Sequence, residues 1–244
     1  MIESPQNEKL KLVRKLRERK HREREGLFAT EGEDLLGAGI AAGASPRLVL
    51  LAADSNIAVA LPVDSGITVE EVEPALLDGV STLGSGTRVI AVWPTPRPAE
   101  PIAPSVYLHG VGDPGNVGTI VRTADALVGG TVVLGPGCAD PYSPKAARST
   151  MGSIFARPPL FGAVAATPAP RAALVAHGGE GLEGLSGAAT ICLGAEREGL
   201  PDAVLAECEA RVTIPLRPGG AESLNVAAAA AIACQRMNEG GSDA

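Results

Sequence analysis

Three short segments in the second half of the chain place polar side chains beside glycines where secondary-structure elements are expected to start or end. In the first, residues 113–118 follow an apolar stretch and open a helix, whose first backbone N–H groups have no partner inside the helix. Helical periodicity places Asn116, Thr119 and Arg122 roughly on one face. A guanidinium such as that of Arg122 suits phosphate because it donates several hydrogen bonds in one plane.

The second segment, residues 194–201, follows the apolar residues 189–193. Gly194 lacks a side chain, so a flat ligand can approach the backbone at the end of the expected strand. Glu196 adds an acidic group there, and Glu198 is interpreted as a solvated neighbour.

The third segment begins with residues 214–216 at the end of an expected strand and continues to Ser223 and Asn225. Ser and Asn are common helix caps, and an Ala-rich helix follows them. They can also serve a site as a polar pair. Both interpretations stay open.

Two common nucleotide sites do not fit these segments. Gly110 and Gly115 have the spacing of a phosphate-binding loop, but Asn116 stands where that loop needs a lysine. No glycine-rich dinucleotide fingerprint follows a strand either. Nucleoside triphosphate hydrolysis and a dinucleotide cofactor are therefore unsupported.

The elements that must position these residues alternate along the second half of the chain. The predicted strands are 105–111, 131–134, 173–176, 190–193 and 211–214. The predicted helices are 115–127, 144–151, 201–207 and 223–237. This alternation predicts an α/β domain with a parallel sheet and helices on its faces.

The first part of the chain predicts a smaller α/β domain. Its expected helices are 5–24 and 34–42, and its expected strands are 27–32, 47–51, 67–69 and 88–92. A proline-rich stretch then indicates a stiff linker. The predicted organisation is a domain over 1–95, a linker over 96–104 and a second domain over 105–244.

Charge is distributed unevenly along the chain. The net charge is −7, yet residues 9–24 hold nine Lys and Arg against Glu18 and Glu23, which makes this segment +7 and the remainder −14. Such asymmetry points to a nucleic-acid contact, although a solvated helix face is the alternative. The predicted contact residues are Lys9, Lys11, Arg14, Lys15, Arg17, Arg19, Lys20, Arg22 and Arg24.

Composition narrows the class of protein further. Aromatic residues make up only 2%, which disfavours stacking of bases on an aromatic platform. The four cysteines show no metal-ligand spacing and are expected to be buried free thiols, so no metal is predicted. No secretion signal and no membrane-spanning run is expected, and a cytoplasmic location is predicted.

Taken in this order, the three segments resemble the three motifs of the SpoU (TrmH-type) RNA 2'-O-ribose methyltransferases, which belong to the SPOUT class. The resemblance implies a C-terminal fold with a trefoil knot, a homodimer, and S-adenosylmethionine as methyl donor, with no metal. It places the donor against backbone groups of Gly194, Ile214, Leu216 and Leu224. It implies catalytic roles for Asn116, Arg122, Glu196, Ser223 and Asn225. Residues 217–222 form a loop about one residue longer than is common in the family.

The role of Arg122 has two interpretations. The family proposal makes it the base, but an arginine rarely gives up its proton because its pKa is about 12.5–13.8. Holding a phosphate of the target and orienting the hydroxyl suits a guanidinium better. The proton acceptor would then be a phosphate oxygen or water.

The resemblance predicts methylation of a ribose 2'-hydroxyl in RNA, which excludes DNA as substrate. Ribosomal RNA of the 23S type is favoured over transfer RNA because of the N-terminal domain, and a resistance enzyme is a close variant. The alternatives are a non-catalytic RNA-binding protein that keeps the SPOUT fold, and a methyltransferase for a protein or small molecule. The sequence does not identify the nucleotide.

Overall fold

The computed structural model describes residues 1–53, 55, 57, 66–98 and 100–241. The gaps fall in the predicted first domain, in the predicted linker and at the end of the predicted second domain, and these positions lie outside the described residues. The chain divides into two compact units. The first comprises Met1–Pro96 with Tyr142–Ala156, and the second comprises Arg97–Pro141 with the chain from Arg157 onward.

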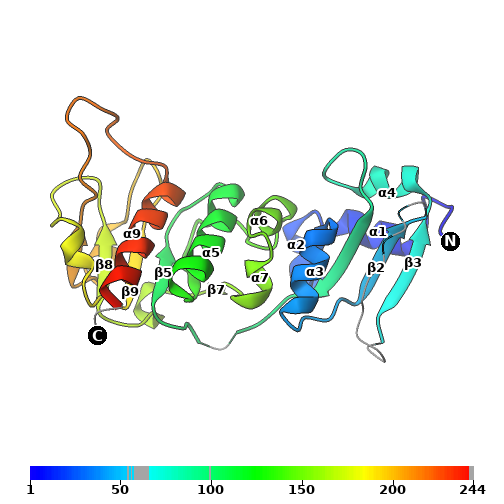
Figure 1. Cartoon of the computed structure of the whole chain (residues 1–244), viewed down its shortest axis with the longest axis horizontal. Helices are drawn as coiled ribbons and strands as arrows, with labels where there is room; N and C mark the ends of the chain where they lie inside the picture. Colours follow the sequence, from blue (N-terminus) through cyan, green and yellow to red (C-terminus); the bar gives the residue numbers. More distant parts are fainter. Residues whose placement is uncertain (54, 56, 58–65, 99, 242–244) are drawn as a thin grey trace. The chain divides into compact units, whose positions relative to one another are not determined.

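The first unit is built on a mixed four-stranded sheet (Figure 1). Its strands, in the order β1-β4-β2-β3, are Leu27–Glu31, Val89–Pro94, Leu48–Ala52 and Thr68–Val72. β4 pairs antiparallel with both β1 and β2, whereas β2 and β3 are parallel. The small α/β domain predicted from the sequence is therefore present.

Neighbouring residues of a strand point to opposite faces of the sheet, and both faces of β2 and β4 are apolar. Helices therefore cover both faces. On one face, Leu48, Leu50 and Ile90 pack with α1 (Glu8–Lys15) and α4 (Pro74–Val80). On the other face, Val49 and Trp93 belong to a cluster that includes Leu36 of α3 (Glu33–Ala41). The indole N–H of buried Trp93 donates to Thr30 at 2.8 Å, so its polar atom is satisfied.

The single helix predicted over 5–24 is wrong. Two helices replace it, α1 and α2 (Arg19–Glu25), and Asn7 caps α1 by accepting from Lys9 N at 2.9 Å. Arg22 is only 5% exposed and donates to the carbonyls of Leu16 and Arg17 at 2.7 and 2.8 Å. These carbonyls sit at the break between the helices, so the guanidinium replaces helical bonds that the break removes.

Residues 142–156 also depart from the predicted organisation. They form α6 (Pro144–Ser149) and α7 (Ser153–Ala156) and belong to the first unit, although the sequence placed them in the second domain. Tyr142 and Phe155 pack on Phe28, with ring centroids 5.0 and 5.8 Å apart. The aromatic side chains of the first unit therefore recruit a segment from the second half of the sequence, a contact that no local pattern predicts.

Among the described residues, the sheet of the second unit has six strands, and all of them are parallel. The parallel arrangement was predicted, whereas the short strand over 160–161 was not. In sheet order β10-β8-β9-β5-β6-β7 they are Ala210–Val212, Arg171–Leu174, Thr190–Leu193, Ser105–Leu108, Val132–Leu134 and Leu160–Phe161. From β5 the chain proceeds to β6 and β7 on one side, and it later returns to place β9 on the other side of β5. Ligands bind where the strand order reverses in this way, outside the carboxyl ends of the strands.

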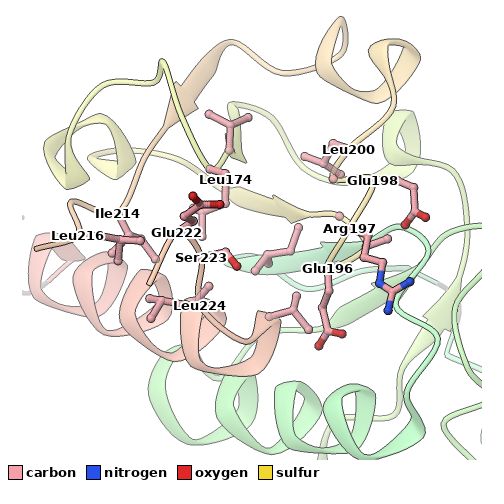
Figure 2. A pocket seen from close by; sticks show the side chains of 18 residues that line it. Leu174, Glu196, Arg197, Glu198, Leu200, Ile214, Leu216, Glu222, Ser223 and Leu224 are labelled. Carbon is pink, nitrogen blue, oxygen red and sulfur yellow. The ribbon is translucent and has the colours of Figure 1, made fainter. Parts of the chain in front are cut away.

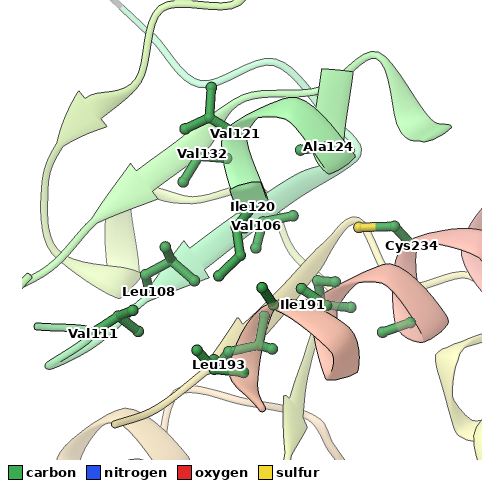
Figure 3. Packing of buried hydrophobic residues seen from close by; sticks show 14 of the residues in the cluster. Val106, Leu108, Val111, Ile120, Val121, Ala124, Val132, Ile191, Leu193 and Cys234 are labelled. Atoms are coloured by element: carbon green, nitrogen blue, oxygen red, sulfur yellow. The ribbon is translucent and has the colours of Figure 1, made fainter. Parts of the chain in front are cut away.

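Two helices cover one face of this sheet, α5 (Pro114–Val128) and α9 (Val226–Gly241). Figure 3 shows Ile120 and Val121 of α5 and Cys234 of α9 among the packed side chains, with Val106 and Ile191 from the strands. Small residues on α9, among them Ala230 and Ala233, are fully buried and let the helices approach closely. The opposite face packs on α8 (Asp202–Leu205) and on Val164 of a 3-10 turn (Val164–Ala166).

Within the part of the chain that the structure describes, no helix is long and apolar enough to cross a membrane.

Candidate active site

The three sequence segments meet at the carboxyl ends of β5 and β9. These strands pair directly, and the backbone N–H of His109 extends the pairing by donating to the carbonyl of Leu193 at 2.9 Å. The segment after β5 opens α5, and the segment after β9 begins at Gly194. Parallel pairing therefore brings residues near 113 and near 196 to one edge of the sheet.

Three side chains from the three segments form a hydrogen-bonded group. Asn116 donates to Glu196 Oε1 at 2.6 Å. Asn225 donates to the same carboxylate oxygen at 3.3 Å and to Asn116 Oδ1 at 3.2 Å. All three were predicted as site residues, and all three bonds are exposed to solvent. The group places one carboxylate between two amides, where a hydroxyl-bearing ligand can exchange hydrogen bonds with it.

Helix capping holds two sides of this group. Asp113 accepts from the backbone N–H groups of Gly115 and Asn116 at 2.7 and 3.1 Å, which orients the first turn of α5. Asn225 accepts from Ala227 N at 2.9 Å and so caps α9. Its oxygen caps the helix while its nitrogen donates to Glu196. The capping interpretation of Asn225 is therefore confirmed, and its catalytic role stays a prediction.

A cavity of about 380 Å³ lies beside the group, and Figure 2 shows its side chains. Its walls come from the ends of β8 and β9, the segment 194–200, and the segment between β10 and α9. The predicted donor-binding residues Gly194, Ile214, Leu216 and Leu224 all line it, together with Glu196 and Ser223. A smaller cavity of about 200 Å³ is lined by residues 110–113, Asn116 and residues 195–198. Glu196 lines both.

Gly194 is required by the packing of the cavity wall. A Cβ at this position would lie 2.1 Å from the carbonyl carbon of Gly199 and 2.2 Å from its oxygen. Gly199 adopts φ +68°, the left-handed region that favours glycine, and donates its N–H to Ala195 O at 2.9 Å. The two glycines therefore let the segment fold back on itself beside the cavity.

Arg122 lies on α5 with its side chain exposed, and it lines neither of the two cavities. Among the described residues it forms no hydrogen bond or ion pair that would engage its guanidinium. The structure thus leaves Arg122 available to a ligand but does not join it to Glu196. Its catalytic role remains a prediction.

The structure also identifies cavity residues that the motifs did not suggest. Leu174, Val175 and Ala176 come from β8 and its end, and they reach the cavity only because β8 pairs with β9. Glu222 lines the cavity from the loop before Ser223. Its position next to a predicted site residue was the one available indication.

The nine Lys and Arg of residues 9–24 that were predicted to contact RNA differ in what their charged groups bind. Five are paired with carboxylates, and Arg22 is buried at the helix break and so unsuited to RNA contact, which corrects its predicted role. The pairs are Lys9–Glu70, Lys11–Glu8, Arg19–Glu23, Lys20–Glu18 and Arg24–Glu25. Arg14 and Arg17 donate to backbone carbonyls, and Lys15 is exposed.

Buried groups behind the site support the strands. The thiol of Cys138 donates to Leu108 O at 3.3 Å, and burial raises its pKa. Burial likewise raises the pKa of Tyr107, whose hydroxyl lies 3.4 Å from His109 Nδ1.

Cys138, Cys192, Cys208 and Cys234 are free cysteines. Within the described residues, no group of three His, Cys, Asp or Glu could hold a metal ion.

Comparison with family models divides the chain in two. Residues 103–235 match the SpoU rRNA Methylase family. Residues 7–91 match the MRM3-like substrate binding domain. All three motif segments fall inside the first match.

One curated relative and two solved structures match this chain over nearly its whole length. The "23S rRNA (guanosine(2553)-2'-O)-methyltransferase RlmP" of Bacillus subtilis is 32% identical over an alignment of 244 positions, which covers 95% of this chain and 96% of the relative. An AdoMet-bound rRNA methyltransferase from Sinorhizobium meliloti is 27% identical, with a TM-score of 0.84 over 96% of this chain and 95% of that one. The SpoU methyltransferase AviRb from Streptomyces viridochromogenes is 26% identical, with a TM-score of 0.84 over 97% and 99%.

Proposed function

Because the chain belongs to the SpoU rRNA methylase family, we propose that it transfers a methyl group from S-adenosylmethionine to a ribose 2'-hydroxyl of ribosomal RNA. The observation that carries the proposal is the hydrogen-bonded group of Asn116, Glu196 and Asn225 beside a cavity lined by the expected donor-binding residues. Polar residues from three distant segments thus lie together beside a cavity of suitable chemistry, which supports the proposal.

The cavity suits S-adenosylmethionine in size and chemistry. Its volume of about 380 Å³ falls in the range of small-molecule sites, about 300–1,000 Å³. Leu174, Ile214 and Leu216 offer apolar walls for a purine, and the close packing at Gly194 keeps the backbone within reach of its edges. Ser223, Glu222 and Glu196 add polar groups for hydroxyls and for positive charge.

S-adenosylmethionine supplies a methyl group on a positively charged sulfur, and transfer to oxygen is an in-line displacement. The task of the chain is to align the hydroxyl and to help its proton leave. Asn116 and Asn225 hold Glu196 in place, and the carboxylate can accept a hydrogen bond from a ribose hydroxyl. Arg122, with its exposed guanidinium, holds a phosphate of the target, and a phosphate oxygen or water takes the proton.

The proposed substrate is 23S-type ribosomal RNA. Support comes from the Bacillus subtilis relative, which matches this chain over nearly its full length and is named for guanosine 2553 of 23S rRNA. The matched substrate binding domain over 7–91 supplies a second unit for the RNA. A 2'-hydroxyl target excludes DNA. A cytoplasmic location belongs to this proposal, since bacterial 23S rRNA is made and used there.

A symmetric homodimer and the knotted C-terminal fold complete the proposal. The dimer is supported by apolar side chains at the surface of the second unit: Leu216, Leu224 and Ile232 are 36%, 38% and 37% exposed. Leu216 and Leu224 line the cavity from the segment before α9, and Ile232 lies on α9. Light scattering on the purified chain measures its mass, and a monomer at working concentrations would contradict the dimer.

The test is methyl transfer from radiolabelled S-adenosylmethionine to total ribosomal and transfer RNA, with donor binding measured by calorimetry. We expect label in ribosomal RNA at a position resistant to alkaline cleavage. Arg122→Ala should reduce the rate at least about a hundredfold and leave donor binding intact, because Arg122 does not line the cavity. Arg122→Lys, which keeps the charge without the planar fork, should recover part of the loss.

Label in transfer RNA alone would replace the proposed substrate. Failure to bind the donor and to label either RNA would favour the non-catalytic RNA-binding alternative.

A further inference from the structure

The cations of the first unit differ in what their charged groups contact. Five of the nine in residues 9–24 are neutralised by a carboxylate, four of these within four positions in the chain. A cation with a carboxylate beside it adds little net charge where a phosphate approaches, because the two opposite charges largely cancel. The best candidates for binding a phosphate are therefore the cations that donate to an uncharged carbonyl or hydroxyl oxygen, because they keep their full positive charge.

Two such cations come from different segments and meet at one turn. Arg17, between α1 and α2, donates from Nη2 to the carbonyl of Ser81 at 2.9 Å. Arg148, in the last turn of α6, donates from Nη1 to the hydroxyl of Thr82 at 3.4 Å. Their acceptors belong to adjacent residues, whose Cα atoms are about 3.8 Å apart. Among the described residues neither guanidinium forms an ion pair.

The turn itself is held firmly. Glu31 accepts from the Ser81 hydroxyl at 2.6 Å, from Thr82 N at 2.9 Å and from the Thr82 hydroxyl at 2.7 Å. These bonds engage both carboxylate oxygens with the turn. The turn is therefore fixed by one carboxylate and accepts a hydrogen bond from each of two guanidinium groups.

We propose that Arg17 and Arg148 together form a binding site for the phosphate backbone of the RNA substrate. Each guanidinium donates one hydrogen bond to the turn, which limits its motion. Its other N–H groups can donate to phosphate oxygens. Contacts of this kind position RNA without reading its sequence. The inference rests on the proposed function, because it requires that the substrate be RNA.

The site would extend the substrate-binding surface beyond the domain that sequence comparison assigns to it. Arg17 lies within the match to the substrate binding domain over 7–91, whereas Arg148 lies within the match to the methylase family over 103–235. Folding joins them because Tyr142–Ala156 packs in the first unit. The segment that supplies Arg148 would thus belong physically to the RNA-binding part.

The experiment compares salt dependence of RNA binding for the full chain and its variants, using 23S rRNA of Bacillus subtilis transcribed in vitro. The double variant Arg17→Gln/Arg148→Gln removes both proposed contacts. The matched control is Arg19→Gln with Lys20→Ala, which removes the same charge from cations already paired with Glu23 and Glu18. Methylation of the same RNA at saturating S-adenosylmethionine is measured in parallel.

We expect the double variant to bind about tenfold more weakly and to lower the salt slope by about 1.5, near 0.7–0.9 for each lost phosphate contact. Its KM for RNA should rise with kcat little changed, and donor binding should match the wild type. The control should change the slope by less than about half a unit. Equal slopes for the two double variants would overturn the inference while leaving the methyltransferase activity in place.

Two further outcomes would also overturn the inference. Normal binding of naked RNA by the double variant, with a loss confined to assembled ribosomal particles, would assign the turn to a protein contact. A wild-type chain that neither binds nor methylates RNA would overturn the proposed function and this inference with it. If the glutamine variants unfold, Arg17→Lys/Arg148→Lys keeps the charge and should retain most of the salt slope.

Discussion

The two units use their polar residues in opposite ways. In the second unit, a few polar side chains scattered over 109 positions of sequence converge, as the bond from Asn225 to Asn116 demonstrates. In the first unit, a dense cluster of cations is largely consumed by near neighbours, as in the pairs Arg19–Glu23 and Lys20–Glu18. A dense run of cations in the sequence therefore suggests more free positive charge than the folded chain offers to a ligand. Polar residues that are widely spaced in the sequence can nevertheless form one hydrogen-bonded group in the fold.

The reason lies in the range of the interactions. Side chains three or four positions apart on a helix are neighbours and pair whatever the fold does. Asn116, Glu196 and Asn225 are brought together only by parallel strand pairing and by the packing of α9 on α5. Charged residues that are close in the sequence therefore pair with one another. Polar residues that are far apart in the sequence keep their hydrogen-bonding groups for a site formed by the fold.

The largest expected effect comes from breaking the convergent group. Glu196→Gln keeps the size of the side chain and removes the charge that Asn116 and Asn225 both contact. We expect the rate of methyl transfer to fall about a hundredfold. The matched control is Glu198→Gln, which lines the same two cavities and should stay within about threefold. Equal losses in the two variants would mean that cavity charge, and not the hydrogen-bonded group, sets the rate.

A second variant tests the close backbone packing in the cavity wall of the second unit. Gly194→Ala places a methyl group against Gly199, so the wall of the cavity must shift. We expect at least a tenfold loss of S-adenosylmethionine affinity in calorimetry and a loss of about 1–3 kcal/mol in unfolding free energy. Gly37→Ala is the control: a Cβ there meets no atom within 4 Å, and α3 should gain about 0.5–1 kcal/mol. Unchanged donor affinity in Gly194→Ala would place the donor elsewhere.

The third comparison concerns how much a buried and an exposed arginine of the first unit contribute to its free energy of unfolding. Arg22→Gln removes the donors to the Leu16 and Arg17 carbonyls and should cost about 2 kcal/mol in urea unfolding. Arg24→Gln removes an exposed partner of Glu25 and should cost less than about 0.5 kcal/mol. Similar costs for the two would show that the buried guanidinium does not hold the helix break together.

The meeting of Asn116, Glu196 and Asn225 was predictable because their motifs resemble those of a known family and because each lies at an expected strand end or helix start. Apolar runs followed by Gly194 and by Asn116 mark strand ends, and parallel strands put such ends on one edge. The alternation of strands and helices also predicted the parallel sheet of the second unit. Leu174 and its neighbours in the cavity wall were not predictable, because their place there depends on which strand pairs with β9.

Residue types and spacing over short spans were enough to predict the family motifs and the α/β class of both units, because both follow from periodicity and side-chain chemistry. Three features appear only in the folded chain: helix 5–24 breaks, Arg22 is buried, and residues 142–156 join the first unit. Each of these depends on contacts between residues far apart in the chain, such as Phe28 with Tyr142. Burial and long-range packing choose among local possibilities that the sequence leaves equally open.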